Sequence, residues 1–372
     1  MRKRISKILA VLLTLTMVLS LSACGNSGGE TKGETKAPET KSEDTKAEET
    51  KAEGETKAEA PAGDSGKSAA DYKIVLLLPG PINDQSWNAT NYAGLQECNN
   101  TLGTNIEYVE NVQASDFEST FREYAERGYD LIMSAGSQFD EAVATVAPNY
   151  PDTTFCVVNG SKCDGDNVAP IFPREYEASY VASIIAGYVT ENGNFATIGG
   201  FPNEPMEHLM DVYETNAIAV AEGRGIENCK ATRAYANSWD DVALGKQMAE
   251  QMIDNGADTL FVYANEVGLG CIEAATAKGA KFIGFSSDQT TIDPDTVVAS
   301  VVFDFKIFYK WAIEQYMNGE LTGNKVHEAG INEGIFVPVY TDNISQEVKD
   351  AVDKGLQDFK DGKVDLTAMF AE

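Results

Sequence analysis

The stretch YKIVLLL at Tyr72–Leu78 indicates the fold class of this chain. Its apolar residues run on without alternating with polar ones, which is typical of a strand buried on both faces of a parallel sheet. The loop Pro79–Ser86 follows, and a helix is then expected to about Leu102. An apolar strand followed at once by a helix is the first half of a β-α-β unit, so the sequence predicts the α/β class.

The same alternation of strand and helix continues along the chain and then begins a second time. Two units of similar size predict two doubly wound lobes, each built on a parallel sheet. Further strands are expected at 106–109, 131–134, 154–158, 168–172, 195–198, 230–235, 260–263 and 281–285. Further helices are expected at 115–127, 141–147, 178–190, 207–222, 241–255 and 271–278.

The segments after residue 289 are expected to cross between the lobes. We predict that the strand Val297–Val302 and the helix Phe305–Met317 return to the first lobe, and that the tail from about His327 crosses again. The resulting division assigns 72–173 plus 290–325 to the first lobe, and 174–289 plus 326–372 to the second.

The N-terminus has the pattern of an export signal. A basic start precedes the apolar run Ile8–Leu19, and small residues precede Cys24. This run is shorter than an ordinary membrane-spanning helix and fits a secretory signal, taken as residues 1–23. Leu21-Ser22-Ala23-Cys24 resembles the box of bacterial lipoproteins, in which the cysteine is acylated before cleavage. The alternative is a plain signal peptide with a cysteine nearby.

Residues 24–70 are interpreted as a lipidated cysteine followed by a disordered tether. They contain no aromatic residue and repeat an acid-Thr-Lys unit, as in Glu30-Thr31-Lys32. Such a segment buries too little apolar surface to offset the entropy of ordering it. A flexible chain of this length reaches roughly 35–40 Å, enough to hold a domain off a bilayer.

The composition excludes several classes of function. The formal net charge is −29, and the charges of the first 70 residues cancel, so the globular part is strongly acidic and should repel nucleic acid. The motifs G-x-S-x-G, H-E-x-x-H and the Walker loop are absent, so we expect no enzyme, metal or cofactor. Five cysteines follow Cys24 (Cys98, Cys156, Cys163, Cys229 and Cys271), and buried free thiols are favoured over a bridge between Cys156 and Cys163.

The loops that follow the strands contain the candidate ligand-binding residues. Ligands of open parallel sheets bind beyond the carboxyl ends of the strands, here in the cleft expected between two lobes. Aromatic rings can stack on a flat heterocycle while amides and carboxylates bind its polar edge. The candidates are Asn83, Asp84, Trp87, Asn88, Ser137, Phe139, Asn159, Phe201, Glu204, Trp239, Asp240, Asn265, Glu266 and Asp288.

Each candidate also has a purely structural interpretation. Trp87 and Trp239 could cap or staple the helices that they precede, and Phe139 and Phe201 could belong to the core. Asp288 could serve a turn, and the two glutamates could be solvated surface residues. The residues alone leave these alternatives open.

Several of these motifs, taken in order over about residues 72–325, resemble the basic membrane protein (BMP) family of ABC-transporter substrate-binding lipoproteins. Asn83–Asn88 is similar to the family's D-x-S-[FW]-N, and Gly128–Ile132 matches its GYDLI. The other matching segments are 177–182 (EASYVA), 198–200 (IGG), 255–258 (NGAD) and 283–289 (IGFSSDQ).

The resemblance implies a type I periplasmic-binding fold, with two α/β lobes joined by a multi-strand hinge. It also implies a purine nucleoside or free purine base stacked on the aromatic residue of the first motif, here Trp87. The chain departs from the family at two positions: Ser286 replaces an acid used on ribose hydroxyls, and Phe303 replaces a lysine. We therefore include Phe303 in the candidate site and favour a base over a nucleoside, since Asn237–Asp241 resembles the S-W-x-D branch that includes binders of free bases.

The sequence thus predicts a monomeric, lipid-anchored binding protein on the outer face of the cell membrane. Its expected partners are a purine base or nucleoside, the permease subunits of an ABC importer, and the membrane through Cys24. The alternatives are a ligand sensor for a membrane receptor, a binder of a flavin or sugar, and an extracellular hydrolase of the same architecture.

Overall fold

The computed structural model describes residues 67–83 and 87–371. The predicted signal segment, Cys24 and the tether up to residue 66 lie outside the described residues, as does the candidate Asp84.

The first sheet has six parallel strands in the order β11-β5-β4-β3-β1-β2. The apolar stretch that opens the globular part forms β1, which pairs with β3 on one side and β2 on the other, and all four of its residues are buried. The strands are β1 (Ile74–Leu77), β2 (Glu107–Val109), β3 (Leu131–Ala135), β4 (Thr154–Val158), β5 (Ile171–Pro173) and β11 (His327–Ala329).

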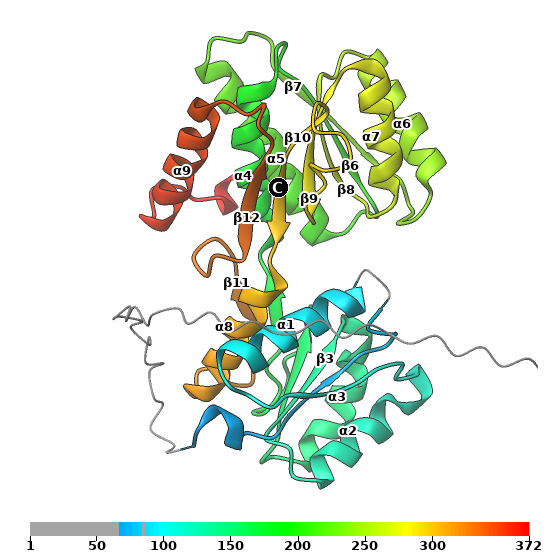
Figure 1. The fold of residues 1–372 in the computed structure, drawn as a ribbon, viewed down its shortest axis with the longest axis vertical. Helices are drawn as coiled ribbons and strands as arrows, with labels where there is room; N and C mark the ends of the chain where they lie inside the picture. The colour runs from blue at the N-terminus through cyan, green and yellow to red at the C-terminus, as the bar shows by residue number, and fades with distance from the viewer. Residues whose placement is uncertain (1–66, 84–86, 372) are drawn as a thin grey trace, which may run out of the picture. The chain divides into compact units, whose positions relative to one another are not determined.

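Helices cover both faces of this sheet, as Figure 1 shows. On one face α1 (Trp87–Thr101) packs against α8 (Phe305–Met317), and their apolar residues join the largest core cluster. The other face is covered by α2 (Phe117–Glu126) and α3 (Asp140–Val146), which enclose a separate core cluster. The helix α2 faces this cluster with Phe117, Phe121, Tyr124 and Ala125, which are all buried.

The second sheet also has six strands, in the order β12-β10-β9-β8-β6-β7. All neighbours are parallel except β12, which runs antiparallel to β10. The strands are β6 (Asn194–Gly199), β7 (Lys230–Tyr235), β8 (Thr259–Tyr263), β9 (Lys281–Ser286), β10 (Val297–Phe303) and β12 (Phe336–Tyr340).

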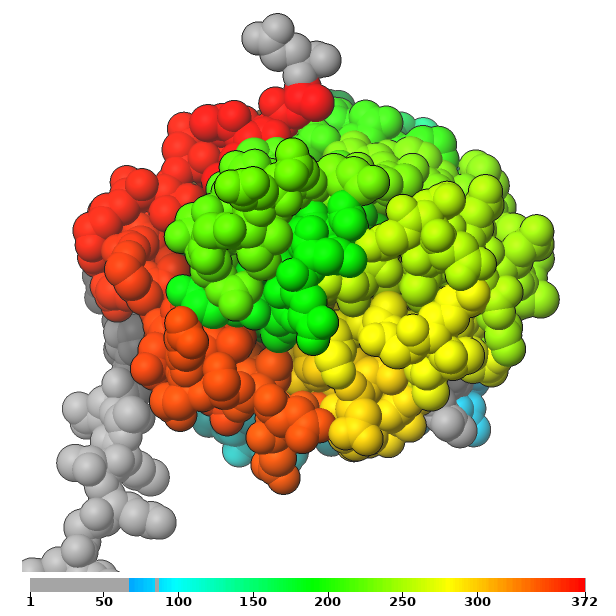
Figure 2. All heavy atoms as spheres, turned by 90° about the horizontal axis from the view of Figure 1, so that it is seen from above, coloured from blue at the N-terminus to red at the C-terminus, as the bar shows by residue number. Residues whose placement is uncertain are grey.

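Helices again cover both faces of the second sheet. The pair α6 (Val242–Asp254) and α7 (Val267–Lys278) encloses a third core cluster with one face. On the other face α4 (Glu175–Val189) packs between α5 (Glu204–Gly223) and α9 (Gln346–Lys360). Figure 2 shows segments from the end of the chain (red), α5 (green) and residues 240–280 (yellow-green) gathered on one surface of this lobe.

Two predicted lobe assignments are wrong. The strand at Val297–Phe303 pairs with β9 and β12 in the second sheet rather than returning to the first. The tail was assigned wholly to the second lobe, but His327–Ala329 pairs with β5 in the first sheet. A buried apolar strand such as VVASVVF fits either sheet equally well, so its sequence pattern does not identify its neighbours.

The chain passes between the two sheets at three places: Pro173–Arg174, Phe303–Asp304 and residues 330–335. These crossings are hydrogen-bonded to one another. Arg174 N donates to Ala329 O, and Asp304 N donates to Ile335 O, each at 2.8 Å. The three segments therefore form one bonded hinge, which fits the multi-strand connection expected from the sequence.

A buried ion-pair cluster lies in this hinge. Glu177, only 2% exposed, accepts from the Arg174 guanidinium and from Ile331 N, while Arg174 also reaches Glu333 at 3.0 Å. Gly330 is required here because a β-carbon at this position would lie 2.0 Å from Glu177 Oε2. The cluster ties the first crossing to the third.

The five cysteines that follow Cys24 are free, and Cys98, Cys156 and Cys271 are buried, as favoured from the sequence. Across 67–83 and 87–371, no helix is both long and apolar enough to cross a bilayer.

Candidate functional site

The candidate loops leave the carboxyl ends of the strands through backbone turns in the left-handed region. Asn159, Asn237 and Asn265 have φ of 63°, 51° and 44°, after β4, β7 and β8. Asparagine adopts this conformation more readily than most residues. Ser286, at the end of β9, has φ of 71°, and backbone strain in a serine is a feature that clusters at binding sites.

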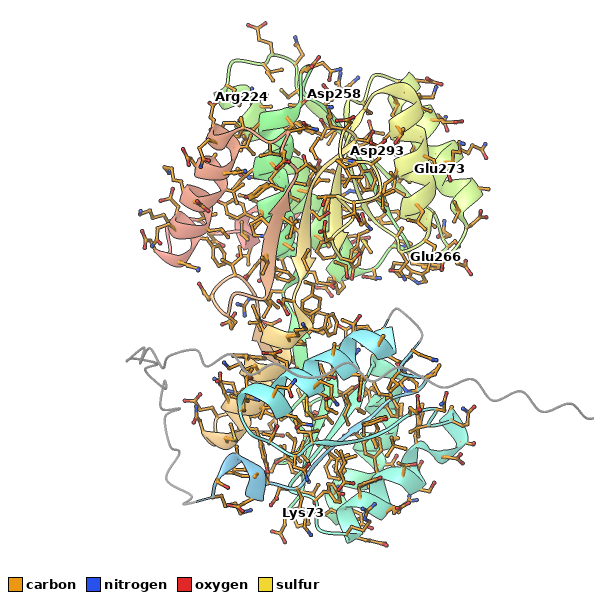
Figure 3. All side chains as sticks on the ribbon, in the orientation of Figure 1. Lys73, Arg224, Asp258, Glu266, Glu273 and Asp293 are labelled. Atoms are coloured by element: carbon orange, nitrogen blue, oxygen red, sulfur yellow. The ribbon has the colours of Figure 1, made fainter. Side chains whose placement is uncertain are left out.

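The direction of the strands gathers these loops at one edge of each sheet. Figure 3 shows the direction of β8: Asp258, just before this strand, and Glu266, just after it, lie at opposite ends of the second lobe. Because β6, β7 and β9 run in the same direction as β8, the loops after these strands begin at the same edge of the sheet as Glu266. The candidates of the second lobe are therefore brought together.

An aromatic cluster of Phe201, Trp239, Tyr263 and Phe285 forms at this edge. The centroids of Phe201 and Trp239 are 5.6 Å apart, and Tyr263 stands edge-on to Trp239 at 6.3 Å and 4.8 Å from Phe285. Trp239 and Phe201 remain 36% and 37% exposed. Large rings that stay exposed at strand ends offer a surface on which a flat molecule can stack.

Gly200 provides room for the Trp239 ring. A β-carbon at position 200 would lie 2.3 Å from a carbon of the indole ring, so any larger residue would displace the tryptophan. The IGG segment that ends β6 is thus needed for the position of a ring contributed by the loop after β7.

Glu175 and Tyr263 form a polar pair beside this cluster. The Tyr263 hydroxyl donates to Glu175 Oε1 at 2.6 Å. Burial raises the pKa of Glu175 to about 7, and the hydrogen bond from Tyr263 offsets this only in part. Sequence reasoning missed both residues, because Glu175 opens a helix and Tyr263 ends a strand, and neither position differs in pattern from an ordinary surface or core residue.

In the first lobe the structure holds Trp87 in a fixed position. Its Nε1 donates to Ala135 O at 3.1 Å, and its ring stands edge-on to Phe305 at 5.5 Å. Asn88, which is 8% exposed, accepts from Gly80 N at 3.1 Å. The indole N–H of Trp87 is thus used by the protein, which leaves its ring as the part that could contact a ligand.

Replacing Trp87 by phenylalanine should expose the role of this hydrogen bond. We expect the variant to lose about 1 kcal/mol of unfolding free energy beyond the loss in Trp311→Phe, because Ala135 O loses its shorter hydrogen bond and keeps only the one from Gln138 Nε2 at 3.5 Å. Trp311 is a half-buried tryptophan that stacks on Phe308. Urea unfolding of the two variants makes the comparison, and equal losses would contradict the prediction.

Two of the predicted site residues belong to the core instead. Phe139 is fully buried, with its centroid 3.9 Å from that of Phe117. Phe303 is 7% exposed and packs against Phe305 and Phe336 at 4.2 and 5.6 Å. Their apolar neighbours cover both rings, so the expectation that they contact a ligand is corrected to a structural role.

Buried polar atoms without a partner gather at the carboxyl ends of β3 and β4. Within the described part of the chain, Ser134 Oγ, Asp140 Oδ1 and Asn159 Oδ1 have no hydrogen-bonding partner. The other oxygen of Asp140 accepts from Ser161 N at 3.1 Å, and burial raises the pKa of Asp140. A buried polar group left unpaired costs about 1–3 kcal/mol, which a polar ligand group could recover. Of the three, only Asn159 was predicted.

The remaining candidates have exposed side chains in the loops after the strands or in the first turn of the element that follows. Asn83, Ser137, Glu204, Asn265 and Glu266 are exposed, and Asn265 and Glu266 directly follow β8. Asp288 is exposed but accepts from Thr290 Oγ1 at 2.6 Å, and Asp240 accepts from Ser238 Oγ at 2.8 Å. These two carboxylates therefore already stabilise their own turns.

Within the described residues, a surface hollow lies away from the candidate residues. It has a volume of about 290 Å³, is lined in part by Lys73, Glu107 and Arg127, and contains none of the candidate residues. Figure 3 shows Lys73 at the far end of the first lobe. In residues 67–83 and 87–371, no group of three His, Cys, Asp or Glu side chains could hold a metal ion.

Known proteins that resemble this chain include two relatives of similar length. An ABC transporter nucleoside-binding protein of Lactococcus lactis is 27% identical over 325 residues, which is 82% of this chain and 91% of the relative. A purine-binding protein of Brucella abortus is 24% identical over 305 residues, or 81% and 85% of the two chains.

The fold is shared with solved structures. A solute-binding protein of an ABC transporter system from Aeropyrum pernix superimposes with a TM-score of 0.61 at 21% identity, over 79% of this chain and 92% of the other. This likeness confirms the expected periplasmic-binding architecture. The model of the Bmp family, described as "ABC transporter substrate-binding protein PnrA-like", matches residues 72–363. The chain therefore belongs to the Bmp family of ABC transporter substrate-binding proteins.

Proposed function

We propose that this protein captures a purine base, or with lower affinity a purine nucleoside, for an ABC importer. The observation that carries the proposal is the exposed pair of Trp239 and Phe201, backed by Tyr263, at the carboxyl edge of the second sheet. Stacking of a base on an aromatic side chain is worth about 1–3 kcal/mol. The stacking ring of the proposed site is thus Trp239, with Trp87 as a second surface from the first lobe.

Polar groups in the first lobe complete the proposed site. Ser134, Asp140 and Asn159 place buried oxygen atoms without partners at the ends of β3 and β4. A purine base has several donors and acceptors on its edge that could pair with such atoms. Ser286 and Phe303 provide neither the carboxylate nor the ammonium group expected for a ribose, which favours a base.

We propose that ligand binding closes the lobes about the three hydrogen-bonded crossings. The ligand shifts the equilibrium between the open and closed forms by the difference between its binding free energies for the two forms. The closed form would then dock on permease subunits, and no residue of the site would form or break a covalent bond. The names of the two relatives, one nucleoside-binding and one purine-binding, support the class of ligand.

The proposed anchor is Cys24, acylated on the extracytoplasmic side and joined to the lobes by the tether. One acyl chain gives only marginal membrane binding, so the cysteine would have to carry more than one. The tether would let a monomeric lobe pair reach its permease while remaining attached to the membrane.

Calorimetry on the chain from residue 25 onward tests the proposed ligand. Adenine, guanine, adenosine, guanosine, riboflavin and glucose are titrated in turn. We expect a purine base to bind with micromolar or lower Kd, and more tightly than its nucleoside. Binding of riboflavin or glucose alone would assign the site to another class of ligand. If none of the purines gives a binding signal, the proposal is contradicted.

A further inference from the structure

The Glu175–Tyr263 pair lies where the ligand of the proposed function would sit. Tyr263 belongs to the aromatic cluster through Trp239 and Phe285, and its hydroxyl donates to Glu175 Oε1. Glu175 is also the first residue of α4, directly after the first hinge crossing. The carboxyl group thus joins the stacking surface to the segment about which the lobes would move.

Glu175 has no cationic partner within residues 67–83 and 87–371. The neighbouring Arg174 forms ion pairs with Glu177 and Glu333 instead. Elements packed against α4 contribute Tyr263 from β8, Lys281 from β9 and Tyr340 from β12, while β10 contributes no ionisable residue. The ionisable residues of α5 and α9 are Glu204, Glu207, His208, Asp211, Tyr213, Glu214, Glu222, Glu347, Lys349, Asp350, Asp353, Lys354, Asp358 and Lys360. Of these groups only Tyr263 shifts the pKa of Glu175, and the other cause is burial.

A carboxyl group in such a setting keeps its proton more readily than one in water, because burial penalises the charged form. A ligand that covers the site would remove further water and favour the neutral acid still more. The neutral acid has an O–H to donate, while the Tyr263 hydroxyl occupies an acceptor position on Oε1.

We infer that Glu175, oriented by Tyr263, contacts the ligand and donates a hydrogen bond to an acceptor atom on the edge of a flat, uncharged heterocycle stacked on Trp239. The inference rests on the proposed function and deepens it, because it names a specificity-determining residue and the chemistry it selects. A ring nitrogen such as those of adenine fits this donor, whereas an anionic ligand would be rejected once the acid ionises.

The test is the pH dependence of binding. With the pKa of free Glu175 at about 7, the fraction of protonated acid falls about tenfold between pH 6 and pH 8, and the affinity for adenine should fall with it. In Glu175→Gln the amide donates at every pH, so binding should persist and the pH dependence should disappear. In Tyr263→Phe the loss of a donor that favours the ionised form should raise the pKa of Glu175 and move the fall in affinity to higher pH.

Controls separate this inference from the proposed function. Glu347→Gln changes an exposed glutamate in the first turn of α9, and it should leave both affinity and pH profile unchanged. Circular dichroism checks that each variant is folded. If the wild type binds a purine but Glu175→Gln has the same pH profile, this inference fails and the proposed function stands. If the wild type binds none of the six titrated compounds at any pH, both fail.

Discussion

Replacing Glu177 by alanine is expected to lower the free energy of unfolding by about 3–5 kcal/mol. Glu177 is buried in the hinge and accepts from the Arg174 guanidinium and from Ile331 N. Its removal leaves the guanidinium with Glu333 as its remaining ion-pair partner and a backbone N–H unpaired. Removing one member of a buried cluster costs more than that member contributes, because Arg174 then stays largely out of water with one carboxylate fewer and Ile331 N loses its acceptor.

Glu328→Ala is the matched control for this prediction. Glu328 lies in β11, one crossing segment away, and is exposed, so its loss should change stability by less than about 0.5 kcal/mol. Urea unfolding monitored by circular dichroism measures both variants. A loss below 1 kcal/mol in Glu177→Ala would show that water solvates the hinge cluster.

Replacing Trp239 by alanine is expected to weaken purine binding about 5- to 150-fold, which corresponds to the 1–3 kcal/mol of a stacked base. The ring is 36% exposed and leans on Tyr263 and Phe201 without filling the core, so stability should change little. Trp239→Phe, which keeps a stacking face, should retain most of the affinity. Calorimetry with the base identified in the ligand screen gives the Kd of each variant.

Tyr108→Ala is the control for the loss of an exposed ring. Tyr108 is 39% exposed, lies on β2 in the first sheet and stacks edge-on against Tyr92. Its loss should leave the Kd unchanged. An unchanged Kd in Trp239→Ala would instead assign the stacking role to Trp87 and contradict the site proposed for the second lobe.

The elements of the fold could be predicted from the sequence where their pattern is local. The run at 72–78 contains β1, and the expected helices at 115–127 and 241–255 contain α2 and α6 to within two residues at each end. Partners of strands were harder to predict. The strand β11 has only three residues, and β10 is apolar except for Ser300, so neither sequence identifies the sheet that the strand joins.

The loops of the candidate site follow from the sequence, whereas the exposure of their side chains does not. Strand-end loops identified Trp239, Phe201 and Asn159, because polar and aromatic residues after apolar strands stand out in the sequence. The same rule selected Phe139, whose ring packs on Phe117 in the core. The rule missed Glu175, because the pKa of this residue is raised by burial among elements that are distant in the chain.

The sequence by itself determined the α/β alternation, the apolar strands and the loops that follow them, because these depend on the spacing of neighbouring residues. Only the tertiary structure decided that β10 lies in the second sheet, that Phe139 is buried and that Glu175 pairs with Tyr263. Those outcomes depend on contacts between residues that are distant in the chain. Such contacts decide which strands pair, which rings are buried and which carboxyl group lies out of water, so no local sequence pattern predicts them.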